Sequence, residues 1–120
     1  VDYKLVIDNI IENYLNFLLS LKKRNKIYVW GPIPTQKDNS PINPEYPYFG
    51  DEITRNKATS YFNNKLEEVC IKNKIVFLSI FKNLINDNFT TKDEFIADGC
   101  HLSQKAWVFA QKELESKGLL

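Results

Sequence analysis

The stretch KIVFLSIF, residues 74–81, holds the longest apolar run of the chain, and its length is that of a strand rather than of a membrane span. A second run, KIYVW at residues 26–30, is rich in β-branched and aromatic residues and is also predicted to be a buried strand. Continuous apolar runs of this kind are typical of strands that are covered on both faces. The two runs are therefore expected to be neighbouring strands of a parallel sheet.

Helical periodicity surrounds both strands. The first helix is expected from about Asp2 to Lys23 and the second from about Glu52 to Asn73. The apolar stripe of the first consists of Tyr3, Ile7, Ile10, Tyr14, Phe17 and Leu21, widened by Val6 and Leu18. That of the second consists of Ala58, Phe62, Leu66 and Val69. A last helix is expected after Ser103, which can cap it, with an inward stripe of Trp107, Ala110 and Leu114.

The order of elements is helix, strand, long loop, helix, strand, irregular segment, helix. This order predicts an α/β domain with a parallel sheet, whose functional site lies beyond the carboxyl ends of the strands. The loop, residues 31–50, contains all five prolines and is longer than most connections, which is typical of a functional loop. Its aromatic residues, Tyr46, Tyr48 and Phe49, argue against disorder. Two strands are fewer than a stable sheet usually has.

Composition excludes several classes of protein. With 16 basic and 15 acidic residues spread along 120 positions, the net charge of +1 offers no basic field for nucleic acid. No membrane span and no secretion signal are recognisable, and the chain starts at Val1 rather than Met, so an upstream segment is expected to have been removed or never included. Two cysteines, Cys70 and Cys100, favour free thiols in a reducing, cytoplasmic compartment. Neither a metal nor a cofactor is expected, because no ligand spacing or glycine-rich phosphate loop is present.

The candidate site is ADGCHLSQKAW, residues 97–107, which contains the one histidine of the chain. A carboxylate at Asp98 can accept the Nδ1–H of His101, which fixes the tautomer and leaves Nε2 to take a proton from a nucleophile. Gly99 suits the tight turn between them. The alternative is a surface turn whose histidine packs or caps without chemistry, since short motifs recur by chance.

This block resembles the last conserved block of the SGNH hydrolases, also called the GDSL esterase/lipase family, an Asp-x-x-His followed by leucine and a closing helix. KIYVWGPIP (26–34) is similar to the family's strand that runs into a loop with Gly and Pro, and residues 55–81 are similar to its next helix and strand. The resemblance implies a flavodoxin-like three-layer α/β/α sandwich and ester hydrolysis through an acyl-enzyme. His101 would be the general base and Asp98 its orienting acid.

The same resemblance implies that residues 1–120 are the C-terminal part of one SGNH hydrolase-like domain, whose front half is absent. No Gly-Asp-Ser nucleophile block is recognisable: FGDE (49–52) has Glu52 where serine is needed, and Ser40 lies in the proline-rich loop. The other serines are expected to be structural: Ser20, Ser60 and Ser116 in helices, Ser79 in a strand and Ser103 at a cap. The chain alone is therefore predicted to be inactive, with one side of its sheet unpaired and apolar.

Two classes of function stay open. The first is a hydrolase piece acting on a small-molecule or carbohydrate ester, completed by a further chain segment or present as a homo-oligomer. The second is a non-catalytic α/β module that binds a partner or sugar through the loop at 31–50, with a structural Asp98–His101 pair. A nucleotide binder is disfavoured, because the chain has only four glycines.

Overall fold

A computed structural model describes residues 2–45, 47–98 and 101–120, so the expectations for Tyr46, Gly99 and Cys100 lie outside the described residues. The elements follow the expected order: α1 (Tyr3–Lys22), β1 (Tyr28–Trp30), α2 (Glu52–Lys72), β2 (Val76–Leu78) and α3 (Trp107–Ser116). Three single 3-10 turns, Phe81–Asn83, Asp93–Phe95 and Gln104–Ala106, connect β2 to α3. Both long helices begin at a capping aspartate: Asp2 accepts from the amide of Lys4 at 2.9 Å, and Asp51 from that of Thr54 at 2.7 Å.

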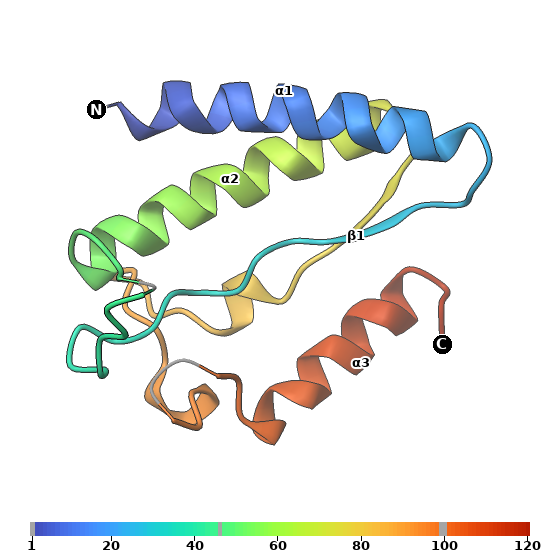
Figure 1. Ribbon diagram of the computed structural model, residues 1–120. Coiled ribbons are helices and arrows are strands. Elements are labelled where there is room, and N and C mark those ends of the chain that lie inside the picture. The colour runs from blue at the N-terminus through green and yellow to red at the C-terminus, as the bar shows by residue number, and fades with distance from the viewer. Residues whose placement is uncertain (1, 46, 99–100) are drawn as a thin grey trace.

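The two strands pair in parallel, as the sequence predicts. Tyr28 lies opposite Val76, Val29 opposite Phe77, and Trp30 opposite Leu78. The helices α1 and α2 lie on one side of the strands and α3 on the other, so the arrangement has three layers (Figure 1). The α/β class and the parallel sheet are therefore confirmed.

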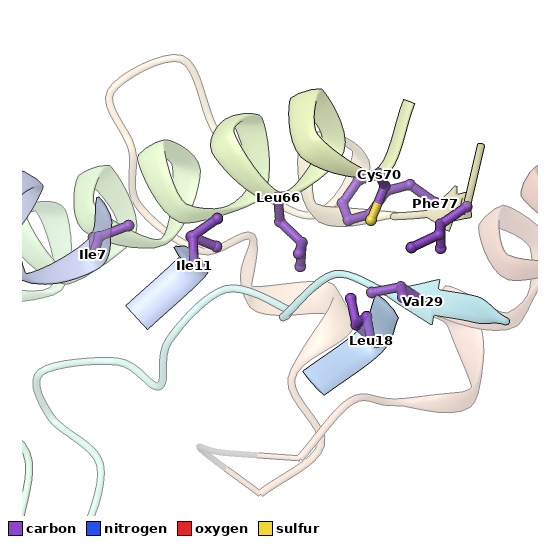
Figure 2. Close-up of a cluster of buried hydrophobic side chains, with 8 residues drawn as sticks. Ile7, Ile11, Leu18, Val29, Leu66, Cys70 and Phe77 are labelled. Carbon is purple, nitrogen blue, oxygen red and sulfur yellow. The ribbon is translucent and has the colours of Figure 1, made fainter. Parts of the chain in front are cut away.

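The main core lies between the sheet and the layer of α1 and α2. Val29 and Phe77, which face each other across the two strands, both belong to it (Figure 2). The other buried members are Ile7, Ile11, Leu18, Leu66, Cys70 and Ile75. A second, smaller cluster joins the end of β2 to the start of α3 and consists of Ile80, Leu84, Phe95 and Ala106.

The apolar stripes expected for α1 and α3 are partly wrong. In α1 the buried face is Ile7, Ile11 and Leu18, whereas Ile10 and Phe17 are about half exposed, because the stripe extends past the edge of what α2 and the sheet cover. In α3 the side chain of Trp107 is 61% exposed, and Ala106, one residue earlier, is buried instead. Ala110 and Leu114 are half-buried, so only the first member of the expected stripe differs.

Ser103 stands at the expected N-cap position but does not cap with its side chain. Its Oγ donates to the carbonyl of Glu94 at 3.0 Å and makes no cap hydrogen bond to the turn Gln104–Ala106. The hydroxyl therefore ties the start of the last helix to the preceding 3-10 turn.

The proline-rich loop is held against α2 by buried polar side chains. Asn56, which is wholly buried, accepts from the amide of Thr35 at 2.9 Å and donates to the carbonyl of Phe89 at 2.8 Å and to Thr91 Oγ1 at 3.0 Å. Thr91 Oγ1 in turn donates to the carbonyl of Thr35 at 2.8 Å. The buried side chains of Asn56 and Thr91 thus bond to each other and to the loop backbone, which fixes the loop to α2.

Lys37 adds an ionic link to the same region. Its Nζ lies 3.1 Å from Glu52 Oε2 and 3.0 Å from Asp93 Oδ1, and it donates to the carbonyl of Thr91 at 2.7 Å. Burial alone would lower the pKa of Lys37, but the hydrogen bonds to Asp93 and Glu52 outweigh it and raise that pKa above its ordinary value. The ammonium therefore connects the loop after β1, the start of α2 and the segment that leads to the candidate site.

No helix among residues 2–45, 47–98 and 101–120 combines the length and the apolar character needed to cross a membrane.

Candidate active site

The candidate pair lies on a narrow antiparallel turn between the 3-10 turn Asp93–Phe95 and the last helix. Ile96 and Leu102 form an isolated bridge, and the amide of Ala97 donates to the carbonyl of His101 at 2.8 Å. The amide of Ser103 donates to the carbonyl of Phe95 at 2.8 Å. Both arms of the turn are anchored, because Phe95 and Leu102 pack in the second apolar cluster.

Asp98 holds His101 with both carboxylate oxygens. Oδ1 accepts from the backbone amide of His101 at 2.8 Å, and Oδ2 lies 2.6 Å from the ring atom Nδ1. The contact expected from the Asp-x-x-His spacing is therefore present. Because one oxygen fixes the backbone and the other meets the ring, the carboxylate orients the imidazole as well as bonding to it.

The pair lies at the surface, with the side chain of His101 77% exposed and that of Asp98 57% exposed. Water competes for a contact of this exposure, so its contribution to folding stability is small. What the arrangement can supply is geometry: Nδ1 is directed to the carboxylate, and Nε2 is the ring nitrogen that would exchange a proton with a substrate or nucleophile.

The pair lies near the end of the sheet at which parallel-sheet sites gather. The chain leaves the carboxyl end of β1 into the proline-rich loop, and the segment that leads into α3 lies at this same end of the molecule (Figure 1). A catalytic site at Asp98 and His101 stays a prediction.

Several serines that the sequence assigns to structure make short backbone contacts. Ser20 donates to the carbonyl of Phe17 at 2.6 Å, and Ser116 to that of Glu113 at 2.7 Å. Ser79 lies just beyond β2, where its Oγ accepts from the amide of Phe81 at 3.2 Å. These hydroxyls stabilise local backbone turns.

Ser40, the serine without a regular element around it, is buried inside the loop at 31–50. Its amide donates to the carbonyl of Lys37 at 3.0 Å, and the hydroxyl of Tyr48 donates to the carbonyls of Asp38 and Ser40 at 3.0 and 3.2 Å. Its surroundings are those of a folded loop, with no strained turn between a strand and a helix.

The described cysteine, Cys70, belongs to the main core. Burial raises the pKa of its thiol to about 11, so the thiolate that would act as nucleophile or metal ligand is scarce at neutral pH. In the described part of the chain, no group of three or more His, Cys, Asp or Glu side chains is placed to hold a metal ion.

Sequence reasoning missed the buried polar group around Lys37, Glu52, Asn56 and Thr91, which is the most elaborate polar feature of this end of the molecule. Its members are up to 54 positions apart and follow no period. The one available signal is the acidic Glu52 in the first turn of a helix whose N-cap, Asp51, is also acidic.

These features define an α/β fold in which two parallel strands lie between helical layers. No family model matches the chain, and no curated protein matches it by sequence. Among solved structures, a protein described as a platelet activating factor from Streptococcus pneumonia is similar with a TM-score of 0.67 and 17% identity, over 92% of this chain and 51% of that one.

Two further solved structures have a similar fold. One described as an acylhydrolase from Bacteroides fragilis has a TM-score of 0.66 and 18% identity, over 95% of this chain and 53% of its own. A GDSL-like lipase from Bacteroides thetaiotaomicron has a TM-score of 0.65 and 17% identity, over 92% and 51%. The chain thus spans about half the length of these proteins, and over that half it has the fold of GDSL-like lipase and acylhydrolase structures.

Proposed function

We propose that this chain is the C-terminal part of an SGNH/GDSL-type serine hydrolase, with His101 as general base and Asp98 as the acid that orients it. The observation that carries the proposal is the 2.6 Å contact between Asp98 Oδ2 and His101 Nδ1, on a turn that leads directly into the last helix. The likeness of fold to GDSL-like lipase and acylhydrolase structures supports it.

In this proposal the reaction is ester hydrolysis in two steps. His101 Nε2 takes the proton of a serine hydroxyl as its oxygen attacks the ester carbonyl carbon, and the protonated ring then gives that proton to the leaving alcohol. Water repeats the sequence on the acyl-enzyme and releases the acid, which restores the serine. Asp98 stabilises the imidazolium formed in each step and keeps the ring in the productive tautomer.

The proposal assigns the serine and the oxyanion donors to a front half of the domain, which would complete a flavodoxin-like sandwich. The substrate class is a small-molecule or carbohydrate ester, and no metal or cofactor takes part. A reducing, cytoplasmic setting is proposed on the ground that Cys70 is a buried free thiol.

A second candidate function is a binding module that uses the loop at 31–50. The observation that favours it is Phe49, whose side chain is 81% exposed on a loop that Arg55 holds in place through hydrogen bonds to Thr35 Oγ1 and the carbonyl of Gln36. An exposed aromatic ring on a fixed backbone is a common anchor for a ligand or partner.

The test is esterase activity on p-nitrophenyl acetate, measured for the 120-residue chain and for the protein that includes the residues encoded before Val1. We expect buffer-level rates for the chain alone and turnover in the longer protein. His101→Ala and Asp98→Ala should each lower kcat of the longer protein by about 10³-fold or more. Phe49→Ala should leave kcat within about twofold, because Phe49 makes no contact with the pair in this proposal.

Turnover of the longer protein that is unaffected by both substitutions would contradict the proposal. Activity of the 120-residue chain alone that is lost in His101→Ala would show that a serine within this chain is the nucleophile. Ser40→Ala would then be the first variant to measure.

A further inference from the structure

Positive charge is concentrated at the end of the molecule where both strands begin. The turn after α1 and the end of α2 lie at this end (Figure 1) and carry six cations: Lys22, Lys23, Arg24, Lys26, Lys72 and Lys74. Residues 13–37 and 69–86, within which these cations lie, contain no aspartate or glutamate. The net charge of +1 for the whole chain therefore conceals a basic region at one end.

Four of these cations line one pocket between the starts of β1 and β2. The pocket has a volume of about 390 Å³ and is lined by Lys22, Arg24, Lys26 and Lys74, together with Asn25 and apolar residues at the strand ends. None of the described residues that line it is acidic. Among the ion pairs of the described chain, none includes a cation of this pocket. Cations that share a hollow without a counter-charge repel one another, so a bound anion would interact favourably with all of them.

Cations at this end would ordinarily serve the carbonyl ends of α1 and α2. Here the direct hydrogen bonds to those carbonyls come mainly from asparagines. Asn25 Nδ2 donates to the carbonyl of Leu21 at 3.1 Å, and Asn73 Nδ2 donates to that of Val69 at 2.7 Å. Lys22 Nζ donates to the carbonyl of Asn73. Capping of the helices therefore accounts for one of the four cations in the pocket and leaves three to be explained.

Lys74 occupies a backbone position that disfavours lysine. It follows the C-cap Asn73 with a φ of +55°, and the amide of Ile75 donates to the carbonyl of Cys70 at 2.9 Å, as in a helix that ends in a left-handed residue. Glycine is the usual residue there, and Gly118, with a φ of +70°, holds the same position after α3. Lysine costs stability relative to glycine at such a position, which favours a use of its ammonium outside folding.

We propose that this pocket binds a phosphate group, carried either by a small phosphorylated molecule or by a lipid headgroup. Arg24 has a planar fork that can donate two parallel hydrogen bonds to phosphate oxygens, and Lys26 and Lys74 add compact positive charges. Phosphate oxygens are strong acceptors, which suits side chains that only donate. The pocket lies at the opposite ends of the strands from the candidate Asp–His pair, and the inference does not depend on the proposed function.

The test is isothermal titration calorimetry with sodium pyrophosphate, on the protein with any residues encoded before Val1. We expect a dissociation constant of about 1 mM or below. Arg24→Gln should weaken binding about tenfold or more, since it removes the two-pronged donor. Lys23→Gln is the matched control, because Lys23 is the exposed neighbour of Arg24, lies outside the pocket lining and loses the same charge. It should change the dissociation constant by about twofold or less.

Lys74→Gly separates ligand binding from folding. We expect this variant to bind pyrophosphate about tenfold more weakly, while its melting temperature rises by about 3 °C, because glycine adopts the left-handed backbone without strain. A lysine that served the fold would give the opposite change in stability. A lower melting temperature of Lys74→Gly would therefore contradict the proposal.

A second arm of the experiment identifies the source of the phosphate. Vesicles of phosphatidylcholine with about one third phosphatidic acid are tested by co-sedimentation. Sedimentation that is lost in Arg24→Gln, without binding of pyrophosphate, would assign the phosphate to a lipid headgroup, and pyrophosphate binding without sedimentation would assign it to a free ligand. Binding of neither probe, or an equal loss in Lys23→Gln, would overturn the proposal. None of these measurements uses esterase activity, so their failure is distinct from a failure of the proposed function.

Discussion

Lys37 and Glu52 form an ion pair of 3.1 Å in which the carboxylate is almost wholly buried, with 7% of the Glu52 side chain exposed. Glu52 Oε2 also accepts from the backbone amide of Thr91 at 2.6 Å. One buried carboxylate therefore joins the loop after β1 to the segment that precedes the candidate site. A buried charge of this kind depends on its partner, since the desolvation cost stays when the partner is removed.

Lys37→Met is expected to lower the free energy of unfolding by about 3 kcal/mol, because it leaves Glu52 buried without its cation. Urea denaturation followed by circular dichroism measures the change. Lys72→Met is the matched control, since Lys72 pairs with Glu68 at 3.3 Å on the exposed surface and should cost at most about 0.5 kcal/mol. If the two variants lose equal stability, the ionic link does not hold the loop.

The protein is expected to lose folding stability in mild alkali because of the buried thiol of Cys70. Burial raises the pKa of its thiol from 9.0 to about 11, so the unfolded chain releases the proton at a lower pH than the folded protein. The contribution to stability is complete below about pH 9 and is lost as the pH rises toward 11. Denaturation midpoints at pH 8 and pH 10 should therefore differ, and the difference should shrink in Cys70→Ala. A Cys70→Ala variant with the same pH dependence as the parent would show that other groups cause it.

Gly31 is required by a close approach between β1 and α2. A Cβ atom at this position would lie 2.0 Å from Asn63 Oδ1 and 2.7 Å from Phe77 Cζ. Gly31→Ala should therefore cost about 2 kcal/mol of stability, as over-packing does in well-filled interiors. The cost should be smaller in an Asn63→Ala background, because the oxygen nearest the new methyl group is absent there. Strictly additive costs in the double variant would argue that the two positions do not meet.

The backbone of the fold could be predicted because the signals are local. Continuous apolar runs placed β1 and β2, and a 3.6-residue apolar period placed α1 and α2 within a residue or two of their ends. The buried face of α1 was harder to predict, because Ile10 and Ile11 are both apolar and only packing decides which of them is buried. Nothing in the spacing of Lys37, Asn56 and Thr91 signals their contact, which depends on tertiary structure.

The candidate site likewise has one feature that local sequence predicts and one that depends on tertiary structure. Asp98 and His101 are three positions apart, so their contact follows from local geometry and could be expected from the sequence. The exposure of the pair could not be expected, because it depends on which other parts of the chain reach that end of the sheet.

The central claim is that Asp98 orients His101 as a base, and the tautomer of the neutral ring tests it most directly. His101 is the one histidine of the chain, so its two ¹⁵N resonances can be assigned without ambiguity. At a pH where the ring is neutral, we predict a proton on Nδ1 and a pyridine-type shift at Nε2, the reverse of the preference of free histidine. Asp98→Ala should return the proton to Nε2. A ring that carries its proton on Nε2 in the parent protein, or whose tautomer is the same in Asp98→Ala, would contradict the account.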